Sequence, residues 1–236
     1  MFRAVTFNLH RGAPMGSDVT DPDGIGAVVA ALDADVLALQ EIDIDVPRSG
    51  HHDLFAICRD AAPGRTGHFA RTVELDGGSY GIGLVVRGSI ADAAVVPLTA
   101  EGEARSVILA RVEVDPGPRS DVPIEVTVAA THLQNQRREA RAQLVEVLAL
   151  LGERPGPHLL MGDLNVGPFT VDGVCMELAW DAVASPPTFP ADTPRTQIDW
   201  VVTRGLRPSA VVVPDVRVSD HRPVVVELDV AAGQVP

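Results

Sequence analysis

Six short segments of the sequence place polar side chains at the ends of apolar runs, where a side chain leaves the core for a loop. These side chains are carboxylates, carboxamides and imidazoles. Oxygen ligands such as those of Glu41, Asp220 and Asn8 suit Mg²⁺ or Mn²⁺, whereas a zinc site would use more His or Cys. The six segments are residues 6–10, 39–41, 131–133, 162–165, 198–200 and 219–221.

Each segment alone has an ordinary structural explanation. Asn8 can cap a turn, and His132 can be a hydrogen-bonded core histidine. Asp163 and Asn165 are two residues apart, a spacing that an Asx turn also produces. Asp199 is different, because it stands between an isoleucine and a tryptophan, and a carboxylate in an apolar run is rarely buried without a partner.

Together and in this order, the segments resemble the endonuclease/exonuclease/phosphatase superfamily of metal-dependent phosphoesterases. This superfamily includes the deoxyribonuclease I, apurinic endonuclease, neutral sphingomyelinase and inositol polyphosphate 5-phosphatase branches. The resemblance spans residues 4–226, and its most specific parts are residues 162–165 (Gly-Asp-Leu-Asn) and 219–221 (Ser-Asp-His). It implies an enzyme that hydrolyses phosphoester bonds.

The resemblance also implies a role for each catalytic candidate. Asp163 would orient or deprotonate the attacking water, and Asn165 would position the phosphate or the nucleophile. His221 would contact the phosphoryl oxygen, with Asp199 holding its ring, and His132 would be the second phosphate-contacting histidine. These roles fit the chemistry, since ester hydrolysis at neutral pH needs an activated water and a sink for negative charge.

A divalent cation completes this set. The resemblance implies that Glu41 is the acidic metal ligand, that Asn8 lies beside the metal and that Asp220 reaches it. Electrostatics requires the cation independently, because three or more carboxylates that converge on an anionic substrate would otherwise repel it. We therefore expect Mg²⁺ or Mn²⁺ as the cofactor.

Three further residues are candidates for substrate binding. Arg48 and Arg105 fall where bacterial relatives often carry arginine, and a guanidinium can bind phosphate through two hydrogen bonds. An exposed surface position is the alternative for both. Tyr80 matches the start of a Tyr-Gly-Asn-Ala motif, but Ile82 stands where that motif has Asn.

The elements that must position these groups are mostly short strands. Apolar and β-branched runs separated by Gly, Pro and Asp outnumber helical patterns about three to one. Helices are predicted over residues 24–32, 52–61 and 137–152. Strands are predicted over residues 3–9, 36–41, 68–74, 81–87, 94–98, 106–114, 124–132, 158–163, 198–203, 210–213 and 224–230.

This pattern predicts an α+β fold: a four-layer α/β/β/α sandwich in which two packed mixed or antiparallel sheets are flanked by helices. The polar loop between residues 114 and 124 predicts an antiparallel hairpin. No linker or repeat interrupts the sequence, so residues 1–236 are predicted to form one domain.

Composition limits the partners. The chain has 19 basic and 32 acidic residues and a net charge of −13, which disfavours long nucleic acids as ligands. No apolar run is long enough to span a bilayer, and no secretory signal precedes the first strand, so a cytoplasmic location is expected.

Three functions remain open at this point. The first is a metal-dependent phosphodiesterase or phosphatase for a small or lipid-derived ester, in which Asp163 activates water and the metal, His132 and His221 stabilise phosphoryl charge. The second is an endonuclease or exonuclease that acts on DNA or RNA. The third is a binding protein on the same fold that has lost catalysis, which the complete set of polar groups disfavours.

Overall fold

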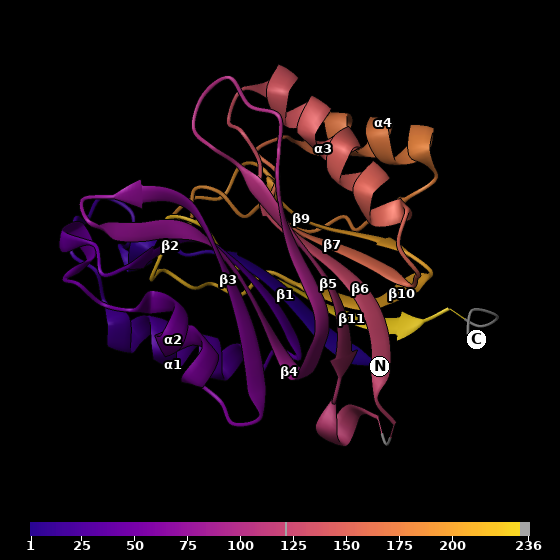
Figure 1. Ribbon diagram of the computed structural model, residues 1–236, viewed down its shortest axis with the longest axis horizontal. Coiled ribbons are helices and arrows are strands. Elements are labelled where there is room, and N and C mark those ends of the chain that lie inside the picture. Colours follow the sequence, from indigo (N-terminus) through magenta and orange to yellow (C-terminus); the bar gives the residue numbers. More distant parts are fainter. Residues whose placement is uncertain (121, 232–236) are drawn as a thin grey trace.

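The scaffold of the molecule is a curled sheet of eleven strands, seen in a computed structural model that describes residues 1–120 and 122–231 (Figure 1). The strands are β1 (Phe2–Asn8), β2 (Val36–Ile44), β3 (Arg65–Leu75), β4 (Gly78–Pro97), β5 (Ser106–Val114), β6 (Ile124–His132), β7 (His158–Asp163), β8 (Asp181–Ala182), β9 (Asp199–Arg204), β10 (Leu206–Val212) and β11 (Val224–Val230). Hydrogen-bonded neighbours follow the order β10-β11-β1-β2-β4-β5-β6-β7-β9-β8, and β3 pairs with β4.

β4 belongs to both halves of this sheet. Its first part pairs with β2 and β3, and its second part pairs with β5. Where the two parts meet, Gly88 has a φ of 129°, and a Cβ at this position would lie 2.1 Å from the Glu113 carbonyl oxygen. The two strands predicted at residues 81–87 and 94–98 are therefore one continuous strand.

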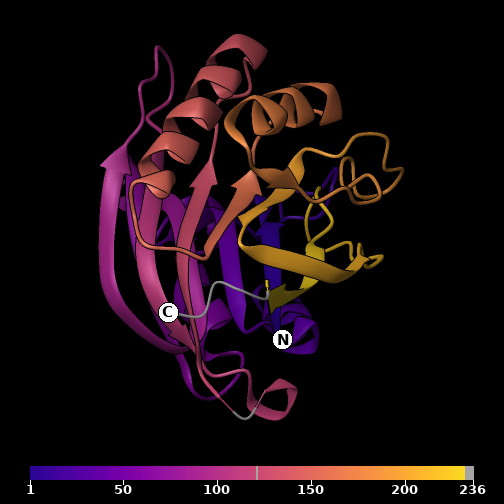
Figure 2. The same ribbon diagram turned by 90° about the vertical axis from the view of Figure 1, so that its right-hand side faces the viewer.

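Four α-helices of the described residues cover the sheet: α1 (Pro22–Leu32), α2 (Leu54–Asp60), α3 (Arg137–Gly152) and α4 (Pro168–Leu178). Figures 1 and 2 show α3 and α4 together on one side of the sheet, and Figure 1 shows α1 and α2 at the other end of the molecule. None of these helices combines the length and hydropathy needed to span a bilayer.

Buried apolar side chains form three clusters. One contains Ala4 and Met161 and lies between the two halves of the sheet, one joins Val5 to Ile25 of α1, and one joins Leu160 to α3 and α4. Successive side chains of a strand point to opposite faces, which is why neighbours in β1 and in β7 belong to different clusters.

The prediction of a mixed α+β fold is confirmed. A sandwich of two separate sheets is not confirmed in that form, because β4 joins both halves into one curled sheet. The antiparallel hairpin is confirmed, with β5 and β6 paired without a register shift from Val107 opposite Thr131 to Val114 opposite Ile124. The helix α4 and the short strand β8 had no counterpart among the predicted elements.

Candidate active site

Two parallel pairs of strands end at the same place in the molecule. β1 and β2 are parallel, with Asn8 opposite Gln40, and β6 and β7 are parallel, with His132 opposite Asp163. β9 runs antiparallel to β7 and begins at Asp199, which is also opposite Asp163. The curl of the sheet brings these strand ends together, so polar groups far apart in the sequence share one site.

Two site residues adopt a left-handed backbone that aims them into this site. Glu41 has a φ of 55° within a bulge of β2, where the register with β4 shifts. Asn165 has a φ of 54°, and its backbone N–H donates to Asp163 Oδ1 at 2.9 Å. The Asx turn considered from the sequence is therefore present, and it also orients both of its side chains. Such a backbone costs roughly 1–3 kcal/mol at a residue other than glycine.

Asp163 is the buried centre of the site. Its Oδ2 accepts a hydrogen bond from Asn8 Nδ2 at 3.0 Å and lies 3.5 Å from His132 Nε2 and 3.7 Å from His221 Nε2. Burial and, after it, the negative charge of Asp199 raise the pKa of Asp163 to about 7 against the opposing effect of His221. A carboxyl group with a pKa near neutrality can exchange protons under physiological conditions.

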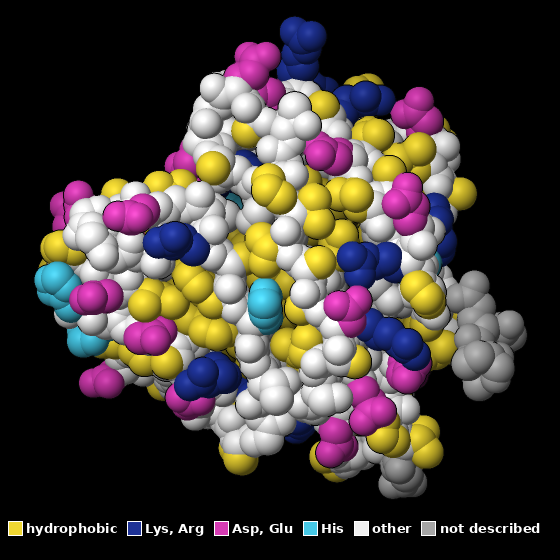
Figure 3. Space-filling view, viewed as in Figure 1, with side chains coloured by type: hydrophobic (Ala, Val, Ile, Leu, Met, Phe, Trp, Pro, Cys, Tyr) yellow, Lys and Arg dark blue, Asp and Glu magenta, His cyan; other side chains and the backbone are white. Residues whose placement is uncertain are grey.

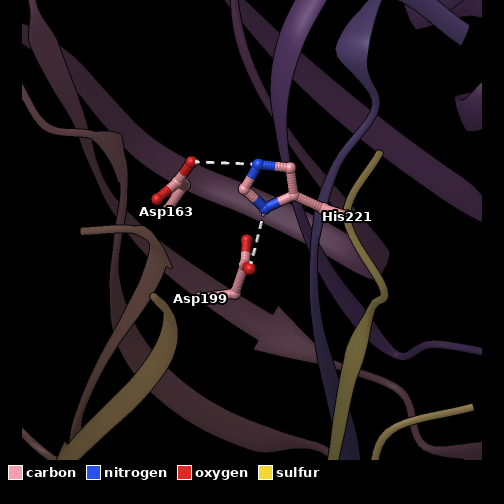
Figure 4. Close-up of side chains that lie close together, drawn as sticks. All are labelled: Asp163, Asp199 and His221. Carbon is pink, nitrogen blue, oxygen red and sulfur yellow. Dashed lines mark hydrogen bonds and ion pairs between the residues drawn. The ribbon is translucent and has the colours of Figure 1, made fainter. Parts of the chain in front are cut away.

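His221 lies between two carboxylates (Figure 4). Its Nδ1 lies 2.9 Å from Asp199 Oδ2, which also accepts a hydrogen bond from Thr188 Oγ1 at 2.5 Å. Burial alone would lower the pKa of His221, but Asp199 and Asp163 outweigh it and raise the pKa to about 10. The ring is therefore an imidazolium at neutral pH: its Nδ1 donates to Asp199, and its Nε2 carries a proton on the side of Asp163, whose Oδ2 lies 3.7 Å away.

His132 has the opposite electrostatic character. Its Nδ1 lies 3.1 Å from Arg105 Nη1, which also contacts Glu103 Oε1 at 2.8 Å. Burial, followed by the positive charges of Arg105 and His221, holds the pKa of His132 well below its usual range. The site thus contains one neutral and one charged imidazole.

Glu41 and Asp220, whose oxygen atoms suit a hard cation, line the same cavity as Asp163. Among the described residues, the Glu41 carboxylate accepts a hydrogen bond only from Asn8 Nδ2, at 3.0 Å. Asp220 Oδ1 accepts a long hydrogen bond of 3.4 Å from Ser219 Oγ and lies 3.7 Å from His10 Nδ1 and 3.9 Å from His221 Nε2. Asp163, Asp199 and His221 also offer ligand atoms within 4.8 Å of one another, but Asp199 and His221 already bond each other. The carboxylates of Glu41 and Asp220 are therefore more available as metal ligands than those of Asp163 and Asp199.

These groups line a cavity of about 480 Å³. On one wall, Arg48 donates two hydrogen bonds of 2.8 Å to the buried Asp43, and its guanidinium lies 5.4 Å from the ring centre of Tyr80. Burial raises the pKa of Tyr80, so its hydroxyl stays protonated. The lining residues are Glu41, Arg48, Val73, Leu75, Tyr80, Glu103, Arg105, His132, Asn135, Asp163, Asn165, Phe189, Ile198, Asp220 and His221.

The structure brings all eleven residues singled out from the sequence to this cavity. Nine line it, while Asn8 and Asp199 lie beneath it with no exposed surface. Thr188, Glu103 and Phe189 also belong to the site but were not among the predicted site residues. The ring centre of Phe189 lies 4.8 Å from that of His221. All three come from segments outside the strands, where no periodic pattern indicates what a side chain contacts.

Comparison with known proteins identifies the family. The model of the Endonuclease/Exonuclease/phosphatase family matches residues 5–221, which include every residue named above as a site candidate. The chain belongs to the endonuclease/exonuclease/phosphatase family. Members of this family are hydrolases that act on phosphoester bonds. The resemblance inferred from the six segments is confirmed.

Solved structures of the endonuclease/exonuclease/phosphatase family share the fold. A family member from Beutenbergia cavernae DSM 12333 is 25% identical, with a TM-score of 0.81 over 98% of this chain and 72% of that one. A mannosyl-6-phosphatase from Bacteroides thetaiotaomicron VPI-5482 is 17% identical, with a TM-score of 0.73 over 97% and 100% of the two chains. The human Nocturnin catalytic domain, with bound sulfate, is 18% identical, with a TM-score of 0.72 over 98% and 94%. A search of curated protein sequences gave no match.

Proposed function

We propose that this protein is a divalent-metal-dependent hydrolase that cleaves a small or lipid-derived phosphoester. One observation carries the proposal: the buried Asp163 carboxylate lies within 3.7 Å of the Nε2 atoms of both His132 and His221. A general base therefore stands beside two groups able to donate to a phosphoryl oxygen, which are the two requirements of ester hydrolysis by water.

Asp163 is the proposed base for the attacking water. Its pKa of about 7 matches the proton affinity that a base needs at neutral pH. Asn8 and the Asn165 backbone each donate one hydrogen bond to it, so both oxygens have fixed directions. The Asn165 amide faces the cavity beside His132 and is placed to orient the phosphate or the water.

His221 and His132 are the proposed stabilisers of phosphoryl charge. His221 keeps its positive charge through its bond to Asp199, which also fixes the plane of the ring. His132 is neutral and contributes an N–H group instead of a charge. Preorganised donors of this kind need no rearrangement when charge develops in the transition state.

The oxygen ligands available in this site fit a hard divalent cation. Glu41 and Asp220 would hold it, with Asn8 beside them and tied to both Glu41 and Asp163. When bound, Mg²⁺ or Mn²⁺ would supply positive charge for the non-bridging phosphoryl oxygens and the leaving group. Burial and, after it, repulsion from Asp199 raise the pKa of Asp163, and a bound cation would offset that repulsion.

The cavity and the surface favour a small ester over a nucleic acid. Both arginines at the cavity are paired with carboxylates, Arg48 with Asp43 and Arg105 with Glu103. On the face drawn in Figure 3, basic side chains stand singly among acidic ones and form no band that could follow a phosphate backbone. With a net charge of −13, the protein would repel long polyanions.

Turnover of bis-p-nitrophenyl phosphate and p-nitrophenyl phosphate with Mg²⁺ or Mn²⁺ tests the proposal. We expect hydrolysis that EDTA abolishes and that Asp163→Asn reduces far more than it weakens substrate binding. Plasmid DNA, single-stranded DNA and RNA assayed in parallel test the nuclease alternative, and faster cleavage of these would reverse the ranking. Absence of turnover on every ester, with binding retained, would indicate a binding protein.

A further inference from the structure

His132 has a nitrogen donor at each of its ring nitrogens. Its Nδ1 lies 3.1 Å from Arg105 Nη1, and its Nε2 lies 3.2 Å from Asn165 Nδ2. The Asn165 nitrogen is a donor because it also bonds the Leu133 carbonyl oxygen, at 3.0 Å. A neutral imidazole has one acceptor nitrogen, so only one of the two neighbours can donate to the ring.

Arg105 is the stronger competitor for the ring. A guanidinium has N–H donors and no acceptor, so a protonated Nδ1 would place two N–H groups against each other beside a positive charge. Arg105 is 8% exposed and its Nη1 is also held by Glu103, so it cannot turn away without breaking that pair. Asn165 lines the cavity, where water or a ligand can accept a hydrogen bond from the second N–H of its amide.

We propose that Arg105 is a positioning residue that selects the Nε2–H tautomer of His132 against competition from Asn165. In this tautomer the ring directs a donor toward the cavity, where Asp163 Oδ2 lies 3.5 Å away. In the other tautomer a lone pair would face the phosphoryl oxygens, which also carry lone pairs. The choice of tautomer thus decides whether His132 stabilises or repels negative charge in the site.

This inference rests on the proposed function for its catalytic consequence, but the tautomer itself is independent of any substrate. It also changes the role expected for Arg105. A residue that binds phosphate would act through its own charge, whereas a positioning residue acts through the hydrogen bond that it gives to Nδ1. The variant Arg105→Gln separates the two roles, because its neutral amide can still donate a hydrogen bond to His132 Nδ1 but carries no charge.

Long-range ¹H–¹⁵N correlation spectra of histidine-labelled protein test the tautomer, with His132→Gln used to assign the signals. We expect a protonated Nε2 in the wild type and in Arg105→Gln and Arg105→Lys. In Arg105→Met we expect the proton on Nδ1, because the hydrogen bond from Asn165 to Nε2, at 3.2 Å, then competes only with the longer approach of Asp163 Oδ2, at 3.5 Å. A protonated Nδ1 in the wild type, or an unchanged Nε2–H in Arg105→Met, would overturn the proposal. The wild-type and Arg105→Gln spectra decide the matter if Arg105→Met does not fold.

Hydrolysis of bis-p-nitrophenyl phosphate with Mn²⁺ tests the consequence. Loss of one preorganised donor costs about 10²-fold or more in kcat, so we expect that loss in Arg105→Met and recovery of most of it in Arg105→Gln. Equal losses of kcat in Arg105→Met and Arg105→Gln, with Nε2–H retained in Arg105→Gln, would overturn the proposed consequence. They would show that catalysis depends on the charge of Arg105 and not on its hydrogen bond to His132. Arg111→Met, on the exposed face of β5, is the matched control and should change neither readout. If the wild type cleaves no ester, the proposed function fails while the spectra still judge the tautomer.

Discussion

The Nδ1 atom of His221 lies 2.9 Å from the Oδ2 atom of Asp199, and neither side chain is more than 6% exposed. Because the carboxylate holds the ring and sustains its positive charge, Asp199→Asn should leave the fold intact and lower kcat. By analogy with other imidazoles held by a buried acid, the expected loss is about 10²–10⁴-fold. Steady-state kinetics check this, with Asp60→Asn at the exposed ion pair with Arg59 as the control. An unchanged kcat would remove Asp199 from the mechanism.

Thr188 binds the same oxygen of this carboxylate. Its Oγ1 donates to Asp199 Oδ2 at 2.5 Å, and both side chains are fully buried. Thr188→Val keeps the shape and removes the donor, so we expect the free energy of unfolding to fall by about 1.5–3 kcal/mol, the usual range for a hydrogen bond to a charged group. Urea unfolding measures this loss. A variant as stable as the wild type would contradict the importance of this contact.

Asp163→Asn should stabilise the metal-free protein at pH 8. Burial raises the pKa of Asp163 to about 7, compared with an ordinary value of 3.8, so the folded state holds this proton more tightly than the unfolded state. The resulting stability is present below pH 3.8 and is lost as the pH rises through about 7. Asn is neutral throughout, so the variant should gain on the order of 1–3 kcal/mol at pH 8 and nothing near pH 4. Unfolding in EDTA at pH 4, 6 and 8 tests this, and equal stabilities at pH 8 would refute it.

Glu41→Gln should weaken the response to metal. The change removes one negative charge from the oxygen donors, while Gln retains an acceptor for the hydrogen bond from Asn8. We expect the Mn²⁺ concentration for half-maximal activity to rise by about 10-fold or more, with part of the rate restored at saturating metal. Titration of activity with Mn²⁺ measures this. Glu125→Gln, at an exposed ion pair on β6, should behave as the wild type.

Trp200 secures the turn that follows Asp163. Its Nε1 donates to the Val166 carbonyl oxygen at 2.9 Å, and the residue is 1% exposed. Trp200→Phe leaves this carbonyl without its donor and opens a small cavity, which should cost about 1–3 kcal/mol. Thermal unfolding measures the loss. No change in the midpoint would show that the surroundings repack.

Much of this fold could be predicted from local pattern, because the strands are short apolar runs bounded by turn residues. β5, β6, β7, β11 and α3 begin and end at the predicted residues. The break predicted within β4 was wrong, since Gly88 and Asp92 look like turn residues in the sequence but pair with β5 as part of a continuous strand. The helix α4 was missed because Pro168 and Gly173 interrupt its apolar pattern, although proline is well suited to a first turn.

The candidate site could be predicted where a functional side chain ends a strand. The pattern could not show what surrounds those side chains, because loops contribute Thr188 and Glu103 through tertiary contacts alone. Nor could it show that Arg48 is already paired with Asp43, five residues earlier in the chain. Such pairing depends on how β2 and its following loop are folded. The roles of the individual residues remain predictions for the experiments above.

Because β4 runs through both halves of the sheet, the active site depends on the two halves staying together. Asn8 and Glu41 lie on strands at one side of this junction, and His132, Asp163 and Asp199 lie on strands at the other. Asn8 spans the division by donating to Glu41 and to Asp163 at once. Neither half holds a complete reaction centre. Partial unfolding that separates the two halves therefore abolishes activity before the rest of the molecule unfolds.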